Sequence, residues 1–275
     1  MNTTLTTIPL VDLSEQHQPL QNQIDAAVRD VLQRGDFILG KDLAEFEAAF
    51  ALKSGVSYGI GTGCGTDAIS LGLQACGIGA NDEVILPTNA FIATLIGVIR
   101  AGAKPILVDC DLDVRGVVRV ARPEYIEATA LIDLEAAAKA ITIKTKAIVP
   151  LHLYGQMVSP RQLLDFASAY NVLIFEDAAQ AHLAQREGYT AGGSGGVGIA
   201  AAYSLYPSKN LGSCGDGGMV LTNNAEVAQK VRSLRNYGAP RKYYHTEFGI
   251  NSRLDNLQAA ILNVLRLTLT NLTTR

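Results

Sequence analysis

The sequence contains no tryptophan, and only four of its 275 residues are cysteines. Cys64, Cys76, Cys110 and Cys214 lie far apart and form no C-x-x-C pair, which excludes a disulfide framework and a cysteine metal site. No apolar run reaches the roughly 18 residues that a membrane helix needs. The amino terminus also lacks the basic and apolar pattern of a signal peptide. We therefore expect a cytoplasmic protein with free thiols and no bound metal.

Charged residues are scarce as well, at 18% of the chain, and they leave a formal net charge of -3. A chain with this balance has no basic surface for nucleic acid, which is therefore an unlikely class of partner. Hydrophobic residues, by contrast, make up 48% of the sequence, enough to form a sizeable core. The length suits one large α/β domain or two ordinary ones.

Short apolar runs alternate with helical stretches through the middle of the chain. The expected strands are 83–87, 105–109, 147–150, 171–177 and 218–222, and the expected helices are 68–76, 90–101, 160–170 and 254–267. Strands that are apolar throughout are buried on both faces, so the pattern predicts an α/β fold with a mainly parallel sheet between helices. Ligands of such sheets bind at the carboxyl ends of the strands. The stretch 111–129 fits neither pattern.

One lysine stands out because of its surroundings, Ser204-Leu-Tyr-Pro-Ser-Lys209-Asn-Leu-Gly212. A lysine amine is a nucleophile only when it is neutral, and burial or a neighbouring cation favours that form. Most lysines in turns are simply solvated surface charges. Other parts of a site elsewhere in the chain are needed to decide between these interpretations.

A glycine-rich run, Gly59-Ile-Gly-Thr-Gly-Cys-Gly65-Thr66-Asp67, precedes the expected helix 68–76. Glycines let backbone amides approach an anion, and the helix dipole adds to the attraction, so a phosphate is the natural ligand. The spacing matches neither the dinucleotide fingerprint nor the P-loop. A tight turn without a ligand explains the run equally well.

Two further residues follow expected strands. Asp177 is either the N-cap of a following helix or the acidic partner of a protonated cofactor ring. Phe91 follows the strand 83–87 and can stack on a planar ring, although a core position suits it too. His152 and His182 have no metal-like companion and fit satisfied core positions. The aromatic and basic loop 238–249 suits a solvated surface, a subunit contact or a lip over a charged substrate.

Taken together, the ordered motifs closely resemble the DegT/DnrJ/StrS family of sugar aminotransferases, which are pyridoxal-phosphate enzymes of the aspartate-aminotransferase fold (fold type I). The resemblance runs from about residue 9 to residue 267. It rests on five segments in order: Gly65 to Asp67, Glu176-Asp-Ala-Ala-Gln-Ala-His182, Ser204-x-Tyr-Pro-Ser-Lys209-Asn-Leu-Gly212, Gly215-Asp-Gly-Gly218 and Asn251-Ser-Arg-Leu-Asp255.

The resemblance implies a role for each matching residue. Lys209 would form the internal aldimine with pyridoxal 5'-phosphate and move a proton, and Asp177 would pair with the ring nitrogen. The remaining contacts would be Gln180 beside the ring hydroxyl, Phe91 on the ring face, and Gly65, Thr66 and Ser204 at the phosphate. Asn251 would reach the phosphate of a neighbouring subunit, which implies a homodimer with shared active sites.

The activity that the resemblance implies is transfer of an amino group from L-glutamate to a nucleotide-linked keto sugar, for polysaccharide or secondary-metabolite biosynthesis. Related dehydratases carry histidine at the position of Lys209, so the lysine favours transamination. The run Asn89-Ala-Phe91-Ile-Ala-Thr94 is more similar to members that act on 3-oxo sugars than to those that act on 4-oxo sugars.

The resemblance also implies a division of the chain. Residues 1–35 would form an N-terminal arm and helix, 36–253 the large domain that binds pyridoxal phosphate, and 254–275 the connection to a small C-terminal domain that is largely missing. Residues 114–128 look like an insertion. Because the small domain closes over substrate in the family, a non-catalytic cofactor-binding regulator and an inactive truncated fragment are the alternatives.

Overall fold

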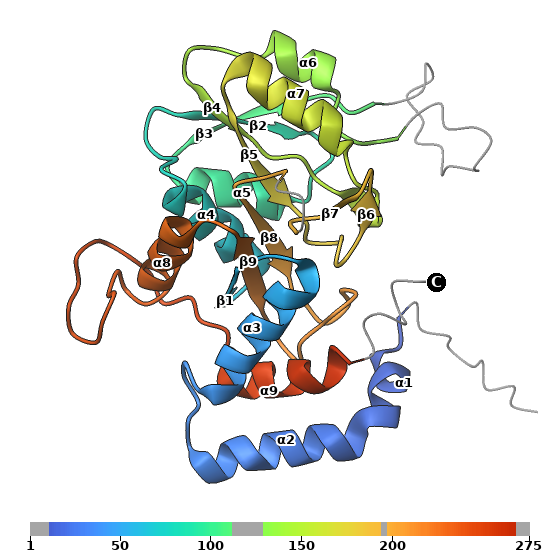
Figure 1. The fold of residues 1–275 in the computed structure, drawn as a ribbon, viewed down its shortest axis with the longest axis vertical. Helices are drawn as coiled ribbons and strands as arrows, with labels where there is room; N and C mark the ends of the chain where they lie inside the picture. The colour runs from blue at the N-terminus through green and yellow to red at the C-terminus, as the bar shows by residue number, and fades with distance from the viewer. Residues whose placement is uncertain (1–10, 112–128, 194–196, 268–275) are drawn as a thin grey trace, which may run out of the picture.

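The computed structural model describes residues 11–111, 129–193 and 197–267, and a single seven-stranded sheet runs through their centre (Figure 1). The strand order is β1-β9-β8-β5-β4-β2-β3. The strands are β1 (Tyr58–Thr62), β2 (Glu83–Pro87), β3 (Lys104–Val108), β4 (Thr145–Ile148), β5 (Leu173–Asp177), β8 (Ala200–Ser204) and β9 (Gly218–Thr222). Of these, β9 alone runs antiparallel to its neighbours, β1 and β8. The expected mainly parallel α/β sheet is therefore confirmed.

Helices pack on both faces of this sheet, and α1 and α2 lie outside that layer. The helices are α1 (Leu13–His17), α2 (Gln21–Arg34), α3 (Lys41–Ser54), α4 (Gly65–Ala75), α5 (Ile92–Arg100), α6 (Leu134–Lys139), α7 (Pro160–Tyr170), α8 (Ala225–Leu234) and α9 (Asn256–Leu265), with short 3-10 turns at Gln18–Leu20 and Leu153–Gly155. A separate two-stranded hairpin joins β6 (Gln185–Arg186) to β7 (Tyr189–Thr190). Among the described residues, no helix is long and apolar enough to cross a membrane.

Alternate residues of the strands pack on opposite faces of the sheet and belong to three clusters of buried side chains. Phe175 and Val220 pack with α4 and α8 in one cluster of buried side chains. Ile174 packs with α6 and α7 on the opposite face, and Tyr203 with α3 and α9. Burying one such side chain stabilises a fold by about 1.5–3 kcal/mol, so strands that are apolar on both sides need a helical layer on each. Figure 1 shows α6 and α7 at one end of the sheet and α2, α3 and α9 at the other.

Local signals in the sequence explain where several helices begin and end. The Ser159 side chain accepts a hydrogen bond from the Gln162 amide and caps α7, whose first residue is Pro160. Asn171 ends the same helix in the left-handed conformation at φ 52°. The expected helix 160–170 is therefore present without change, whereas the expected helix 90–101 is shortened to α5 because Phe91 remains extended at its N-cap.

The last described helix, α9, belongs to the same packed body as the first ones. It contacts α2 and α3. Its Asn256 side chain is buried and accepts a hydrogen bond from the Leu43 amide at 2.8 Å. Asn256 also donates to the Asp42 carboxylate, which lies in the first turn of α3. These contacts hold residues 254–265 against the N-terminal helices.

Candidate active site

A cavity of about 630 Å³ opens at the carboxyl edge of the parallel strands. Loops that follow β1, β2, β4, β5 and β8 all contribute to its wall. The wall contains seven of the residues singled out in the sequence: Gly65, Thr66, Phe91, Asp177, Gln180, Ser204 and Lys209. Because strands that run the same way end at one edge, positions far apart in the sequence meet here. Asn251 is the one predicted cofactor residue that does not line this cavity.

Asp177 is the last residue of β5 and its side chain is only 2% exposed. Its Oδ2 accepts a hydrogen bond from the Thr94 hydroxyl at 2.6 Å, and its Oδ1 accepts from the Ala179 amide at 3.1 Å. Burial raises the pKa of Asp177, and the Thr94 hydroxyl opposes the shift. The N-cap interpretation of Asp177 is wrong, because turns rather than a helix follow β5 and the bond to Ala179 closes an Asx turn.

The preceding carboxylate, Glu176, faces the opposite side of the sheet. One oxygen accepts hydrogen bonds from His152 Nε2, at 2.8 Å, and from the Gly192 amide, at 2.9 Å. The other oxygen accepts from the Gly198 amide at 3.1 Å. Since His152 Nδ1 accepts from the Val158 amide, its proton lies on Nε2. The expectation that His152 is a satisfied core histidine is confirmed.

The amino terminus of α4 forms the end of the cavity that suits an anion. Cys64 is the N-cap but makes no side-chain hydrogen bond to the first turn, so the amides of Gly65 and Thr66 remain available. Gly65 lies directly against Ser204, whose Cβ would be 3.0 Å from an added Cβ at Gly65. The helix terminus, the serine hydroxyl and the close approach of the two loops together make a cradle that suits a phosphate group.

The first half of the glycine-rich run is not part of this turn. Gly59 and Gly61 lie inside β1, where α3 packs so closely that a Cβ at Gly61 would be 3.0 Å from Leu43. Asp67, in the first turn of α4, has a structural contact instead of a place at the anion site. Its carboxylate accepts hydrogen bonds from Arg100 Nη1 and from Ser252 Oγ, both at 2.6 Å. Asp67 therefore anchors α5 and the 251–253 segment to α4.

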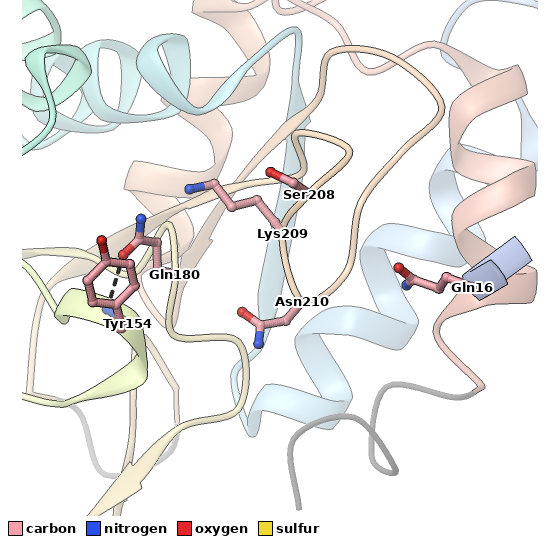
Figure 2. A pocket seen from close by; sticks show the side chains of 6 residues that line it. All are labelled: Gln16, Tyr154, Gln180, Ser208, Lys209 and Asn210. Carbon is pink, nitrogen blue, oxygen red and sulfur yellow. Dashed lines mark hydrogen bonds between the residues drawn. The ribbon is translucent and has the colours of Figure 1, made fainter. Parts of the chain in front are cut away.

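Lys209 lines the first cavity and also a second one of about 490 Å³. The lining of the second cavity consists of Gln16, Tyr154, Gln180, Ser208, Lys209 and Asn210. Figure 2 shows Gln16 approaching from α1, on the far side of the loop that carries Ser208 and Asn210. Partial burial lowers the pKa of Lys209, while the Asp177 carboxylate opposes this shift. A lysine of this kind is more easily converted to the neutral nucleophile than an exposed one.

Gln180 is oriented by a backbone contact that the sequence did not reveal. Its Oε1 accepts a hydrogen bond from the Tyr154 amide at 3.0 Å (Figure 2). Its Nε2 has no hydrogen-bond partner among the residues that the structure describes and remains a donor for the cavity. Tyr154 adopts a left-handed conformation at φ 53° and is followed by Gly155 at φ 84°. This tight turn presents the Tyr154 amide to Gln180 and its ring to both cavities.

Both Phe91 and His182 could be core side chains from the sequence, but only His182 is buried in the structure. Phe91 is 74% exposed and lines the cavity, so the core interpretation is wrong and a stacking position is available. The His182 ring is buried against Phe50 and Tyr203. Burial, and secondarily the positive charge of Lys209, lowers the pKa of His182 to about 4. His182 is therefore a neutral core side chain, but the expectation that it is satisfied is wrong, because in the described part of the chain neither of its nitrogens reaches a hydrogen-bond partner.

These groups fit pyridoxal phosphate. The cradle at Gly65, Thr66 and Ser204 suits its phosphate, the Asp177 carboxylate its ring nitrogen, and the open Phe91 face its planar ring. Lys209 projects into the same cavity. Among the described residues no group of three or more histidine, cysteine, aspartate or glutamate side chains is placed to hold a metal ion.

Comparisons with known proteins agree with this geometry. The model of the DegT/DnrJ/EryC1/StrS aminotransferase family matches residues 18–271. A protein named pleiotropic regulatory protein, from Geobacillus stearothermophilus, is 44% identical over 257 residues, which are 94% of this chain and 64% of the relative. UDP-N-acetyl-3-dehydro-alpha-D-glucosamine 3-aminotransferase from Acidithiobacillus ferrooxidans is 42% identical, again over 94% of this chain, and 65% of the relative is covered.

A solved structure extends the similarity to three dimensions. DesV from S. venezuelae, in complex with a ketimine intermediate, superposes with a TM-score of 0.88 at 38% identity. The match covers 97% of this chain and 67% of DesV. The chain thus spans less than two thirds of the length of the two curated relatives, at 64% and 65%. The fold predicted from the sequence, that of a pyridoxal-phosphate-dependent aminotransferase, is confirmed.

Proposed function

The chain belongs to the DegT/DnrJ/EryC1/StrS aminotransferase family, and on this premise we propose that it transfers an amino group from L-glutamate to a nucleotide-linked keto sugar with the help of pyridoxal phosphate. The observation that carries the proposal is the convergence of Lys209, Asp177 and the α4 phosphate cradle on one cavity. Bound pyridoxal phosphate supplies an aldehyde that takes up amines and a protonated ring that withdraws electrons.

Each residue of the chain has a separate task in this proposal. The Lys209 amine would hold the cofactor through its aldehyde carbon and, once released, would carry a proton to and from the substrate carbon. The ionised Asp177 carboxylate would face the ring nitrogen and keep it protonated. Gln180 Nε2 would donate to the ring oxygen, Phe91 would cover one ring face, and Ser204 would hold the phosphate with the α4 amides.

The second cavity supports a sugar as the acceptor. Apart from Lys209, its lining carries amides and hydroxyls and no charge, which suits the hydroxyl groups of a sugar ring better than a second carboxylate. Lys209 lines both this cavity and the cofactor cavity, so a keto group bound here would lie close to its Nζ. By analogy with the 3-aminotransferase from Acidithiobacillus ferrooxidans, we assign a 3-oxo sugar nucleotide as the acceptor.

A homodimer with shared sites is part of the same proposal. Asn251 is exposed and lies outside the cavity of its own chain, which leaves it available to a neighbouring copy. The 238–249 loop carries exposed aromatic side chains, among them Phe248 and Tyr243, that a subunit contact would cover. We also propose that the chain is divided into an N-terminal arm and helix, 1–35, a large domain that binds the cofactor, 36–253, and a segment that connects to a small C-terminal domain, 254–275.

The test is the visible absorption spectrum of the purified chain with pyridoxal phosphate, before and after addition of L-glutamate. We expect a cofactor band that bleaches with glutamate and returns with a 3-oxo sugar nucleotide. Borohydride reduction followed by peptide mapping should place the cofactor on Lys209. Lys209→Ala should lose both the label and transamination, whereas Lys139→Ala, at an exposed site that lines neither cavity, should keep them. Full transamination by Lys209→Ala would refute the proposal.

The similarity to the pleiotropic regulatory protein favours one second candidate, a cofactor-binding regulator without turnover. The same spectrum separates the two functions. A band that forms on Lys209 but does not respond to glutamate or to any keto sugar nucleotide would establish the regulator and exclude the transferase.

A further inference from the structure

We propose that Thr94 is a positioning residue that fixes the Asp177 carboxylate toward the cofactor ring and joins it mechanically to the Phe91 face. This inference rests on the proposed function, because it assigns Thr94 a part in the same cofactor site. Thr94 stands in the third position of α5. Nothing in its residue type distinguishes it in the sequence, and only the packing of α5 against the end of β5 brings it to the site.

The contact between the Thr94 and Asp177 side chains is short and shielded from solvent. The Thr94 hydroxyl donates to Asp177 Oδ2 at 2.6 Å, and the two residues are 1% and 2% exposed. Both nevertheless line the cofactor cavity. A hydroxyl that donates to a buried carboxylate makes a charge-assisted bond, stronger than one between neutral groups. Thr94 therefore restrains Asp177 at the point where the carboxylate meets the cavity.

The other oxygen of Asp177 is held from the opposite direction. Oδ1 accepts the Ala179 amide at 3.1 Å. With one donor on each oxygen, rotation about the last side-chain bond of Asp177 would break both bonds. The lone pairs that these donors leave free are the ones available to a ring nitrogen in the cavity. The orientation of the carboxylate is thus set before any ligand binds.

Helix α5 also connects Thr94 to Phe91, the residue proposed to stack on the cofactor ring. The Thr94 amide donates to the Phe91 carbonyl at 3.0 Å, which closes the first turn of α5 on the stacking residue. One turn further on, Gly97 packs so closely on α4 that an added Cβ would lie 2.5 Å from Ile69 Cγ2. The contact fixes α5 against the helix whose amino terminus forms the phosphate cradle. Thr94 is the residue of α5 that connects this rigid unit to Asp177.

The charge balance around Asp177 shows why a donor is needed. Burial raises the pKa of Asp177, and the groups that oppose the shift are the Thr94 hydroxyl, the Ala179 amide and the charge of Lys209. Glu176, the next residue in β5, is turned to the other face of the sheet, toward His152. Thr94 is first among the opposing groups. Removing its hydroxyl therefore favours the neutral acid, which cannot keep a ring nitrogen protonated.

The experiment compares Thr94→Val, which keeps the shape and removes the hydroxyl, with Thr94→Ser, which keeps the hydroxyl. The carboxyl titration of Asp177 is followed in the cofactor-free protein by ¹³C NMR of labelled aspartate, with Asp177→Asn to assign the signal. Thr94→Val should raise the Asp177 pKa by about one to two pH units, the loss expected for a hydrogen bond to a charged group. Thr94→Ser should titrate like the wild type.

A second readout is the affinity for pyridoxal phosphate, measured by absorbance titration. Thr94→Val should weaken binding by about tenfold or more, and Thr94→Ser should restore it. In an Asp177→Asn background, Thr94→Val should have less than about a twofold effect, because its action passes through Asp177. Thr94→Ala, which also lacks the hydroxyl, replaces Thr94→Val if the valine variant does not fold.

The outcomes separate this inference from the proposed function. If the wild type binds the cofactor on Lys209 and Thr94→Val titrates and binds like the wild type, the inference alone is overturned. An equal loss of affinity in the wild-type and Asp177→Asn backgrounds would also overturn it, since Thr94 would then act directly on the cofactor. A wild type that binds no pyridoxal phosphate would overturn the proposed function, and the role toward the ring with it.

Discussion

The segment from Glu176 to His182 sends its polar side chains to two different regions of the molecule. Asp177 and Gln180 line the cofactor cavity. Glu176 and His182, each 2% exposed, are buried in the protein on the other side of the sheet. Neighbours in a strand point to opposite faces, so one short motif supplies a functional surface and a structural anchor together.

The two neighbouring carboxylates, Glu176 and Asp177, differ in how they are satisfied. On the buried side, Glu176 is saturated by His152 and two backbone amides. On the cavity side, Asp177 keeps an open direction and Gln180 keeps a free Nε2. This one segment therefore combines a residue that stabilises the fold, Glu176, with residues that face the cavity, Asp177 and Gln180. Substitution separates the two, because the buried side should affect unfolding and the cavity side should affect binding.

The largest effect is expected from Glu176→Ala. The substitution leaves His152 Nε2 and the Gly192 and Gly198 amides without an acceptor, so unfolding should become easier by roughly 3 to 5 kcal/mol. Urea denaturation measures this loss. Glu45→Ala, at an exposed carboxylate paired with Lys41, should cost less than about 1 kcal/mol. Equal losses at both positions would remove the distinction between the two regions.

Asp177→Asn should show the opposite profile. Transamination should fall by about 100 to 1,000-fold, the size of a lost electrostatic contact in an active site. Because burial raises the pKa of Asp177, the ionised carboxylate lowers stability at neutral pH. The asparagine variant should therefore be at least as stable as the wild type at pH 7, and this advantage should shrink as the pH falls toward 4. Thermal melts across that range test the sign.

The sequence predicted the cavity side better than the buried side. Lys209, Asp177 and Phe91 follow strand ends, and their convergence depends only on the parallel direction of the strands. Glu176 differs from Asp177 by one position, and nothing in the residue types says which of the two meets the cavity. That choice follows from the register of β5 against β4 and β8, which is a property of the folded sheet.

The other features that the sequence did not predict also depend on long-range packing. Thr94 and Tyr154 are recognised only as partners of Asp177 and Gln180, through helix packing and a left-handed turn. The glycine pattern assigns Gly59 and Gly61 to a phosphate turn, yet they serve the close packing of α3 on β1. Long-range packing decides each of these cases, and local patterns carry little information about it.

His182 offers a smaller and pH-dependent test on the buried side. Its pKa is lowered from 6.5 to about 4 by burial, so the unfolded chain takes up a proton on His182 before the folded chain does. Stability is complete above about pH 6.5 and declines as the pH falls to 4, by roughly 2 kcal/mol at pH 5. His182→Phe should lack this part of the pH dependence in urea denaturation.

The control for His182 is His245→Gln, which removes an exposed histidine. This variant should keep the pH dependence of the wild type. A His182→Phe protein whose stability falls between pH 7.5 and pH 5 as steeply as that of the wild type would show that His182 is protonated in the folded state. The description of His182 as a neutral, buried side chain would then be wrong.

The smallest effect is expected from Gln180, since a neutral hydrogen bond contributes about 1 kcal/mol. Gln180→Ala should weaken pyridoxal phosphate binding by about tenfold or less. Gln180→Glu can still accept from the Tyr154 amide but presents an oxygen where the Nε2 donor stood, so it should bind more weakly than the alanine variant. Gln16→Ala, in the second cavity only, should leave cofactor affinity unchanged and raise the KM for the keto sugar. If Gln180→Glu binds as tightly as the wild type, the cavity does not use Gln180 as a donor. Asp177 would then be the only polar side chain of the 176–182 segment that acts on the ligand.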